Sequence, residues 1–109
     1  MQYERRKAPR IRVNLSARWE GALHQESATI TNLSTTGCFV LSGGAVQARE
    51  LIWLQIDLPR AQPVQFWGEV VDAAHEIGFG MKFNSSGDDD QTRLGKYIDG
   101  VFASEPGKK

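Results

Sequence analysis

The sequence predicts a mainly β protein: an antiparallel barrel or sandwich of about six short strands, followed by one C-terminal helix. Apolar and polar residues alternate over several short segments, and turn-forming residues separate these segments from one another. Near the C-terminus the spacing of the apolar residues lengthens to three or four, as in an amphipathic helix. The chain has 109 residues, of which 40% are hydrophobic, and this suits a single globular domain.

The clearest strand spans residues 11–19, in which every second residue is apolar: Ile11, Val13, Leu15, Ala17 and Trp19. Because side chains alternate between the two faces of a strand, Arg10, Arg12 and Arg18 project away from the core. A second strand is expected over residues 27–31, before the turn-rich segment NLSTTG. A third, over residues 38–41, ends at a turn over residues 42–44.

Residues 51–58 form an apolar stretch that ends at Pro59 and predicts a buried fourth strand. In the fifth strand Val64, Phe66 and Val70 share a face, and Gly68 indicates a bulge or a point of close packing. The sixth strand places four apolar residues on one face: Ile77, Phe79, Met81 and Phe83. Gly78 and Gly80 leave its other face almost bare, so we expect another element to approach closely there.

The predicted C-terminal helix carries a single apolar stripe, formed by Leu94, Tyr97, Ile98, Val101 and Phe102. Asp88 or Asp89 is expected to cap its first turn, where negative charge is favourable. We expect the apolar stripe to cover one opening of the barrel. The last segment, residues 104–109, is expected to be disordered.

The net charge of the chain is zero, but the charge is unevenly distributed. Residues 1–18 hold 6 of the 13 basic residues and 1 of the 13 acidic residues, a balance of +5, so the remainder carries −5. A positive field this local suits a small anion better than a long nucleic acid. There is no membrane-spanning run and no signal peptide, and the single Cys38 excludes an internal disulfide, so a cytoplasmic location is expected.

The sequence shows no pattern typical of an enzyme or a metal site. His24 and His75 lie in separate turn regions, and Cys38 lies in an apolar run where a buried thiol is expected. The segment GFGMKF resembles a phosphate-binding loop only superficially, because it lacks the strand-to-helix context that such a loop needs. We therefore expect no catalytic residue, no metal and no cofactor.

Two segments stand out as candidate binding elements. The first is RRKAPR, where Arg6 and Arg10 form an RxxxR spacing, Arg5 precedes them and Pro9 disfavours a helix. Arginine binds phosphate through two parallel hydrogen bonds and stacks on purines. By itself this segment also fits a solvated basic arm.

The second candidate is TNLSTTG, in which Asn32, Ser34 and Gly37 form an NxSxxG pattern between two strands. Short polar side chains of this kind hydrogen-bond the edge of a base, and Gly37 can adopt a positive φ. By itself this segment also fits an ordinary turn.

Together, in a small β-rich domain, the two segments resemble the PilZ domain family of receptors for the bacterial second messenger cyclic di-GMP. RRKAPR is similar to the family's RRxxxR, and TNLSTTG is similar to its [DN]xSxxG, with Asn32 in place of the more frequent Asp. FWGEVV followed by IGFGMKF is similar to the family's late hairpin. The resemblance covers almost the whole chain and implies a six-stranded antiparallel β-barrel with a C-terminal helix.

The resemblance also implies how a ligand is bound. Arg6 and Arg10 would pair with phosphates and pack on guanines, while Asn32 and Ser34 would hydrogen-bond a guanine edge. Gly37 would let the turn take its shape and the ligand approach. Arg5 resembles the residue of family members that bind an intercalated cyclic di-GMP dimer. Asn32 keeps the acceptor oxygen of Asp but loses its charge, which weakens a contact with a guanine N–H.

The expected organisation is a flexible basic arm over residues 1–10, a PilZ-like barrel with its helix over residues 11–103, and the tail. On this interpretation the protein is a non-catalytic receptor whose arm becomes ordered by cyclic di-GMP. A protein partner in motility, adhesion or exopolysaccharide control would read the changed surface.

Two alternatives remain at this point. One is a PilZ-like interaction module that needs no nucleotide. The other is a small oligonucleotide-binding β-barrel, for which Trp53 and Trp67 could stack bases; their surroundings are not basic, and no DNA or RNA partner is expected.

Overall fold

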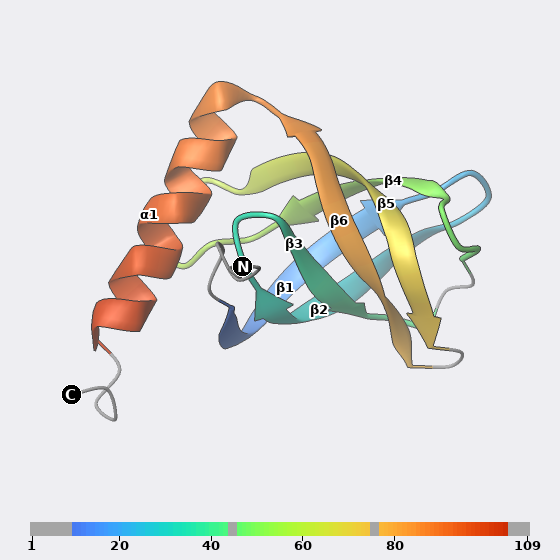
Figure 1. Cartoon of the computed structure of the whole chain (residues 1–109), viewed down its shortest axis with the longest axis horizontal. Helices are drawn as coiled ribbons and strands as arrows, with labels where there is room; N and C mark the ends of the chain where they lie inside the picture. The colour runs from blue at the N-terminus through green and yellow to red at the C-terminus, as the bar shows by residue number, and fades with distance from the viewer. Residues whose placement is uncertain (1–9, 44–45, 75–76, 105–109) are drawn as a thin grey trace, which may run out of the picture.

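The computed structural model describes residues 10–43, 46–74 and 77–104 (Figure 1). Six strands precede one helix: β1 (Ile11–Glu20), β2 (Gln25–Leu33), β3 (Gly37–Leu41), β4 (Leu51–Ile56), β5 (Val64–Ala74), β6 (Gly78–Ser86) and α1 (Asp88–Ser104). The strands form a closed antiparallel barrel in the order β1-β2-β3-β6-β5-β4. The prediction of a mainly β barrel with a C-terminal helix is confirmed.

The alternation in β1 determines which of its faces enters the barrel. Ile11, Leu15, Ala17 and Trp19 are buried, whereas Arg12 and Arg18 are exposed. The register against β2 shifts by one residue between Arg12 and Leu15. This bulge keeps apolar side chains inside on both sides of the irregularity.

Aromatic side chains fill the barrel interior. Trp19 is fully buried, its ring meets Phe79 edge-on with 5.3 Å between centroids, and its indole N–H donates to Ser42 Oγ at 2.9 Å. Phe66 and Phe83 stack with a centroid distance of 4.3 Å. Each of these rings buries a large apolar area, which stabilises the fold.

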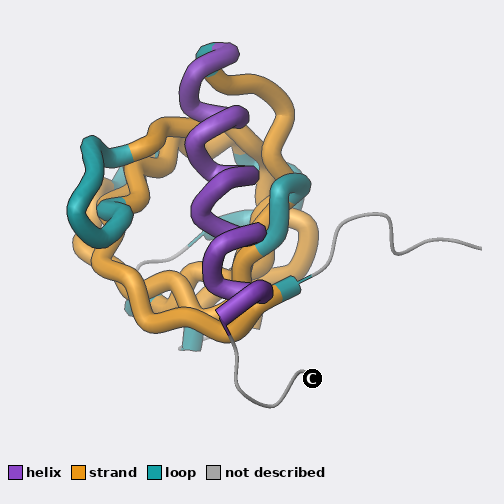
Figure 2. Tube along the Cα trace, turned by 90° about the vertical axis from the view of Figure 1, so that its left-hand side faces the viewer, coloured by secondary structure: helices purple, strands orange, loops and turns teal. Residues whose placement is uncertain are grey.

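The helix α1 lies across one opening of the barrel (Figure 2). Leu94 and Ile98 from its apolar stripe join the buried core, as expected. The predicted cap is wrong by a residue or two, because the amide of Gln91 donates to the carbonyl of Gly87 at 3.2 Å. Gly87 therefore occupies the capping position, and the acidic residues lie within the first turn of the helix.

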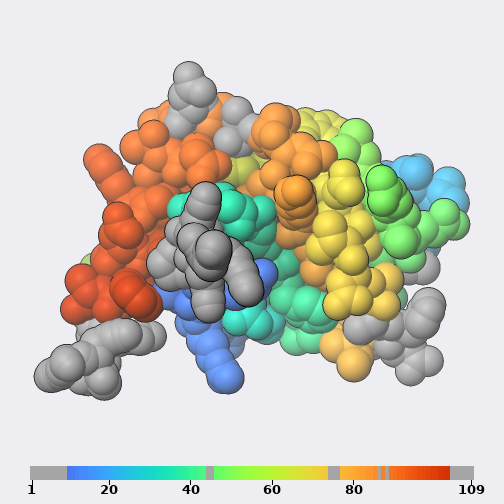
Figure 3. All heavy atoms as spheres, in the orientation of Figure 1, coloured from blue at the N-terminus to red at the C-terminus, as the bar shows by residue number. Residues whose placement is uncertain are grey.

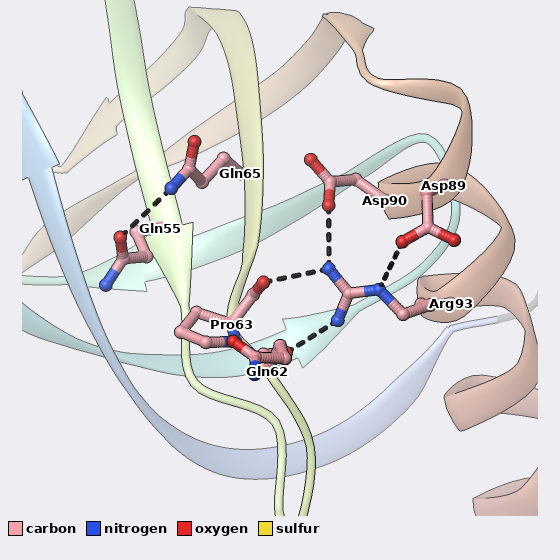
Figure 4. Close-up of polar contacts among 7 residues, drawn as sticks. All are labelled: Gln55, Gln62, Pro63, Gln65, Asp89, Asp90 and Arg93. Carbon is pink, nitrogen blue, oxygen red and sulfur yellow. Dashed lines mark hydrogen bonds and ion pairs between the residues drawn. The ribbon is translucent and has the colours of Figure 1, made fainter.

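Arg93 fastens the helix to the segment between β4 and β5 (Figure 4). Its guanidinium donates to the carbonyl of Gln62 at 2.7 Å and to that of Pro63 at 3.0 Å. It also pairs with Asp89 at 2.9 Å and with Asp90 at 2.8 Å. The acidic run thus orients the arginine that holds α1 over the barrel end.

Three glycine-related expectations have different outcomes. The register of β5 against β6 shifts between Trp67 and Gly68 with the extra residue on β6, and a side chain on Gly68 would collide with the carbonyl oxygen of Lys82, which confirms close packing there. A side chain on Gly78 would collide with the backbone of Val40, which confirms the close approach there, but Gly80 has ordinary space around it. Ile77 does not share the buried face, because it lies before β6 and is exposed.

Candidate functional site

The segment between β2 and β3 forms a tight turn that its own side chains stabilise. The amide of Ser34 donates to the carbonyl of Gly37 at 2.9 Å, and the amide of Thr36 donates to Ser34 Oγ at 3.1 Å. The Ser34 hydroxyl also contacts Thr36 Oγ1 at 3.1 Å and is only 1% exposed. The buried Ser34 side chain therefore stabilises the turn through hydrogen bonds within it.

Gly37 is required for a different reason from the one expected. No described glycine has a positive φ, so the turn makes no use of the left-handed conformation that only glycine adopts freely. Instead, an added side chain at Gly37 would collide with the carbonyl oxygen of Met81 on β6, the residue before Lys82, which is paired with Gly37. The glycine permits the close approach of β3 and β6 at the base of the turn.

The start of β1 brings basic side chains beside this turn. Arg12 lies opposite Asn32, and continuing the register from the Ile11–Leu33 pair places Arg10 beside Ser34. Arg10 and Arg12 are both exposed, and neither forms an ion pair with another described residue. Two arginines with no ion-pair partner among the described residues therefore lie beside the Asn32–Ser34 segment.

The partner strand adds an aromatic residue to the same outer surface. Phe39 on β3 is half-buried and pairs with Asn32 on one side and with Gly80 on the other. Arg12 and Phe39 had no assigned role in the sequence interpretation. The alternation along the first strand places Arg12 on the same face as Arg10 and can be seen in the sequence. The pairing of Phe39 with Asn32 depends on the register of β2 and β3, which the sequence does not reveal.

The arm residues cannot be placed in the same way. Arg5 and Arg6 lie outside the described residues, so the structure tests neither their positions nor the predicted flexibility of residues 1–10. Of the six predicted site residues, the structure brings together Arg10, Asn32, Ser34 and Gly37.

Cys38 follows the turn and lies inside the barrel. Burial raises the pKa of its thiol to about 12, and the nearby charge of Arg10 acts in the opposite direction. A thiol in this environment stays protonated at neutral pH and is a poor nucleophile.

The turn is connected to the elements beyond β2 and β3. The amide of Phe83 on β6 donates to the carbonyl of Thr36 at 2.9 Å. The side-chain amide of Gln91 on α1 donates to the carbonyl of Thr35 at 3.2 Å. A displacement of the turn would therefore change a hydrogen bond that the helix covering the barrel end forms.

Other kinds of site find little support in the described part of the chain. Its His, Cys, Asp and Glu side chains form no cluster of three or more that could hold a metal ion, and His24 is exposed. None of the helices among these residues combines the length and the apolar composition needed to cross a membrane.

Comparison with known proteins identifies a matching family and several structures with the same fold. The PilZ domain model matches residues 4–100. No curated protein sequence matches the chain significantly.

Three solved structures share the fold at low sequence identity. The Bacillus subtilis inhibitor of motility MotI/DgrA aligns over 94% of this chain with a TM-score of 0.77 and 20% identity. The Klebsiella pneumoniae MrkH–c-di-GMP complex aligns over 97%, with a TM-score of 0.77 and 17% identity. The c-di-GMP-bound PilZ domain of Escherichia coli YcgR aligns over 87% of this chain and 88% of its own, with a TM-score of 0.69 and 13% identity. The chain spans only about half of MotI/DgrA and MrkH, 53% and 55% of their lengths.

Proposed function

This chain belongs to the PilZ domain family, and we propose on that basis that it is a non-catalytic receptor for cyclic di-GMP. The observation that carries the proposal is the outer surface beside the β2–β3 turn, where Arg10, Arg12 and Asn32 meet. The MrkH and YcgR structures, which share the fold, contain c-di-GMP.

The ligand's chemistry matches this surface. Cyclic di-GMP carries two phosphates and two guanines, and a guanidinium satisfies either a phosphate or the face of a purine. Arg6 and Arg10 of the RxxxR segment bind the ligand together. Arg10 lies at the start of the barrel, and Arg6 belongs to the arm. Arg12 adds positive charge beside them, and Phe39 offers an apolar surface on the far side of Asn32.

Asn32 reads the guanine, and Ser34 holds the turn that presents it. The side chain of Asn32 is half-buried at the strand end, where its amide oxygen accepts from a guanine N–H edge. The family resemblance implies a direct hydrogen bond from Ser34 to guanine. To form it, the Ser34 hydroxyl must give up its hydrogen bond with Thr36 Oγ1. Gly37 contributes by keeping β3 close to β6.

The signal passes through the turn as well as through the arm. Ligand on Asn32 and the turn acts on α1 through the bond from Gln91 to the Thr35 carbonyl. The arm, residues 1–10, closes over the bound nucleotide, and Arg5 contacts the second molecule of an intercalated dimer. A cytoplasmic protein partner in motility, adhesion or exopolysaccharide control reads the resulting surface.

Titration calorimetry with cyclic di-GMP tests the proposal. Arg10→Ala and Asn32→Ala should each weaken binding about tenfold or more, because each removes a contact to charge or to a base edge. Arg18→Ala is the matched control, since Arg18 is exposed on the same face of β1 but lies at its other end. Equal affinities for all of these proteins would contradict the assigned site.

The stoichiometry and the wild-type affinity test the remaining parts. Two nucleotides per chain are expected for an intercalated dimer, and one per chain would exclude it. An absence of wild-type binding would favour the interaction module that needs no nucleotide. An oligonucleotide partner is disfavoured, because Glu20 and Glu50 line the pocket that Trp53 and Trp67 share.

A further inference from the structure

A pair of tryptophans lies on the outside of the barrel, far from the β2–β3 turn. Trp53 on β4 is paired directly with Trp67 on β5, and Trp67 is 46% exposed. Leu51, two residues before Trp53 on the same face, is 55% exposed. Exposed aromatic side chains grouped in this way mark interaction surfaces more often than single exposed apolar residues do.

An open pocket of about 540 Å³ lies against this pair. Its apolar lining comes from Ala22, Leu51 and both tryptophans, and its charged lining from Glu20 and Glu50. None of the described residues that line it is basic; Arg49 lines the neighbouring pocket instead. The pocket therefore combines aromatic faces with negative charge, which is the combination that attracts a cation.

The carboxylate of Glu50 is held in place by the backbone. One of its oxygens accepts from the amide of Gln47 and the other from the amide of Ala22, each at 3.0 Å. A side chain on Gly21 would crowd this carboxylate, so the glycine leaves room for it. A carboxylate has about four acceptor positions, so Glu50 retains capacity for a further donor.

The pocket and the nucleotide site lie at opposite ends of β1. Glu20 is the last residue of that strand and Ile11 the first, a separation of about 30 Å for an extended strand of this length. The β1–β2 turn and the segment entering β4 lie side by side at the end of the molecule opposite α1 (Figure 3). A partner bound there would leave the nucleotide surface open.

We propose that this pocket binds a segment of a partner protein that carries an arginine or lysine next to a leucine-sized apolar side chain. The cation lies over an indole face and pairs with Glu20 or Glu50, and the apolar side chain packs on Leu51 and Trp67. Charge complementarity selects this occupant, because the described lining of the pocket offers two carboxylates and no cation. The inference adds a surface to the proposed receptor and does not depend on nucleotide binding.

The three tryptophans make a direct test possible by NMR. The indole N–H signals of Trp53 and Trp67 report on the pocket, and the buried Trp19, bonded to Ser42, is an internal control. The probe is the blocked peptide Gly-Leu-Arg-Leu-Arg-Gly, titrated into the nucleotide-free protein. A matched peptide with glutamine in place of both arginines is the control. We expect saturable shifts at Trp53 and Trp67 with the arginine peptide alone.

Variants establish which side chains bind the peptide. Glu20→Gln should weaken binding about fivefold, and Trp67→Ala should abolish it. Asp72→Asn and Val71→Ala are the controls, because both side chains are exposed on β5 outside the pocket. Retained cyclic di-GMP binding by Trp67→Ala would show that the variant is folded and that the two sites are separate.

Four results would overturn the proposal. The first is an absence of saturable shifts up to about 5 mM peptide, and the second is equal binding of the glutamine peptide. The third is a response to cellobiose with none to the peptide, which would indicate a carbohydrate platform. The fourth is a shift of the Trp67 signal with protein concentration alone, which would assign the face to a second copy of the chain.

Discussion

Gly37 provides a prediction that separates two explanations for the same residue. If the residue is needed because β3 and β6 approach closely, then any side chain is harmful, since its Cβ would collide with the carbonyl oxygen of Met81. That oxygen belongs to a paired strand and cannot move aside cheaply. Overpacking of this kind costs about 1–3 kcal/mol, which corresponds to a fall in Tm of about 4–12 °C for a domain of this size.

The two explanations differ in what they predict for asparagine. Asparagine tolerates a left-handed backbone, so Gly37→Asn would be milder than Gly37→Ala if φ were the reason. The close approach predicts that Gly37→Asn is at least as destabilising. Urea unfolding followed by tryptophan fluorescence measures both, and the buried Trp19 supplies the signal.

Gly95→Ala is the matched control for this series. Gly95 lies in α1 and has open space where its Cβ would be, so alanine should stabilise the protein by about 0.5–1 kcal/mol. A Gly37→Ala protein within about 0.5 kcal/mol of wild type, or one clearly less stable than Gly37→Asn, would refute the steric reasoning.

Three further predictions concern the helix and the core. Arg93→Ala should lower the free energy of unfolding by about 1–3 kcal/mol in urea, because it removes two carbonyl contacts and two ion pairs; Lys96→Ala, on the same helix, should change it little. Burial raises the pKa of Cys38 from 9.0 in the unfolded chain to about 12, so its contribution to stability is complete below pH 9 and is lost as the pH rises toward 12. Cys38→Ala should remove the part of the fall in unfolding free energy that the Cys38 thiol causes. Identical slopes of unfolding free energy against pH above pH 9 for the two proteins would contradict this. Gln91→Ala should leave cyclic di-GMP affinity within about twofold but reduce the ligand-induced change in amide exchange of α1, since it removes the bond to Thr35; an unchanged response would place the relay elsewhere.

The elements themselves could be predicted because each is encoded locally. The alternation in β1 and the helical stripe around Leu94 both depend on residues close together in the sequence. The same applies to the outward direction of Arg10 and Arg12, which follows from the period of a strand.

Features that depend on pairing between distant strands could not be predicted in the same way. The need for Gly37 arises from β6, 44 residues further on at Met81, and the strand order that brings them together is not written in either segment. The pairing of Phe39 with Asn32 depends on an irregularity in the β2–β3 register. The direct pairing of Trp53 with Trp67 likewise depends on the register of β4 and β5.

Closure of the barrel has a consequence for how signals leave this protein. Because β1 pairs with β4 as well as with β2, each of the six described strands has a neighbouring strand on both sides, and the barrel closes. Among the described strands, closure leaves a partner no strand that is unpaired along its whole edge, and addition of a strand to such an edge is a common mode of peptide recognition. Recognition by a partner then uses side chains at the helix-covered end, at the opposite turns or on the outer face of the barrel. Substitutions on these surfaces can change partner specificity without altering the fold.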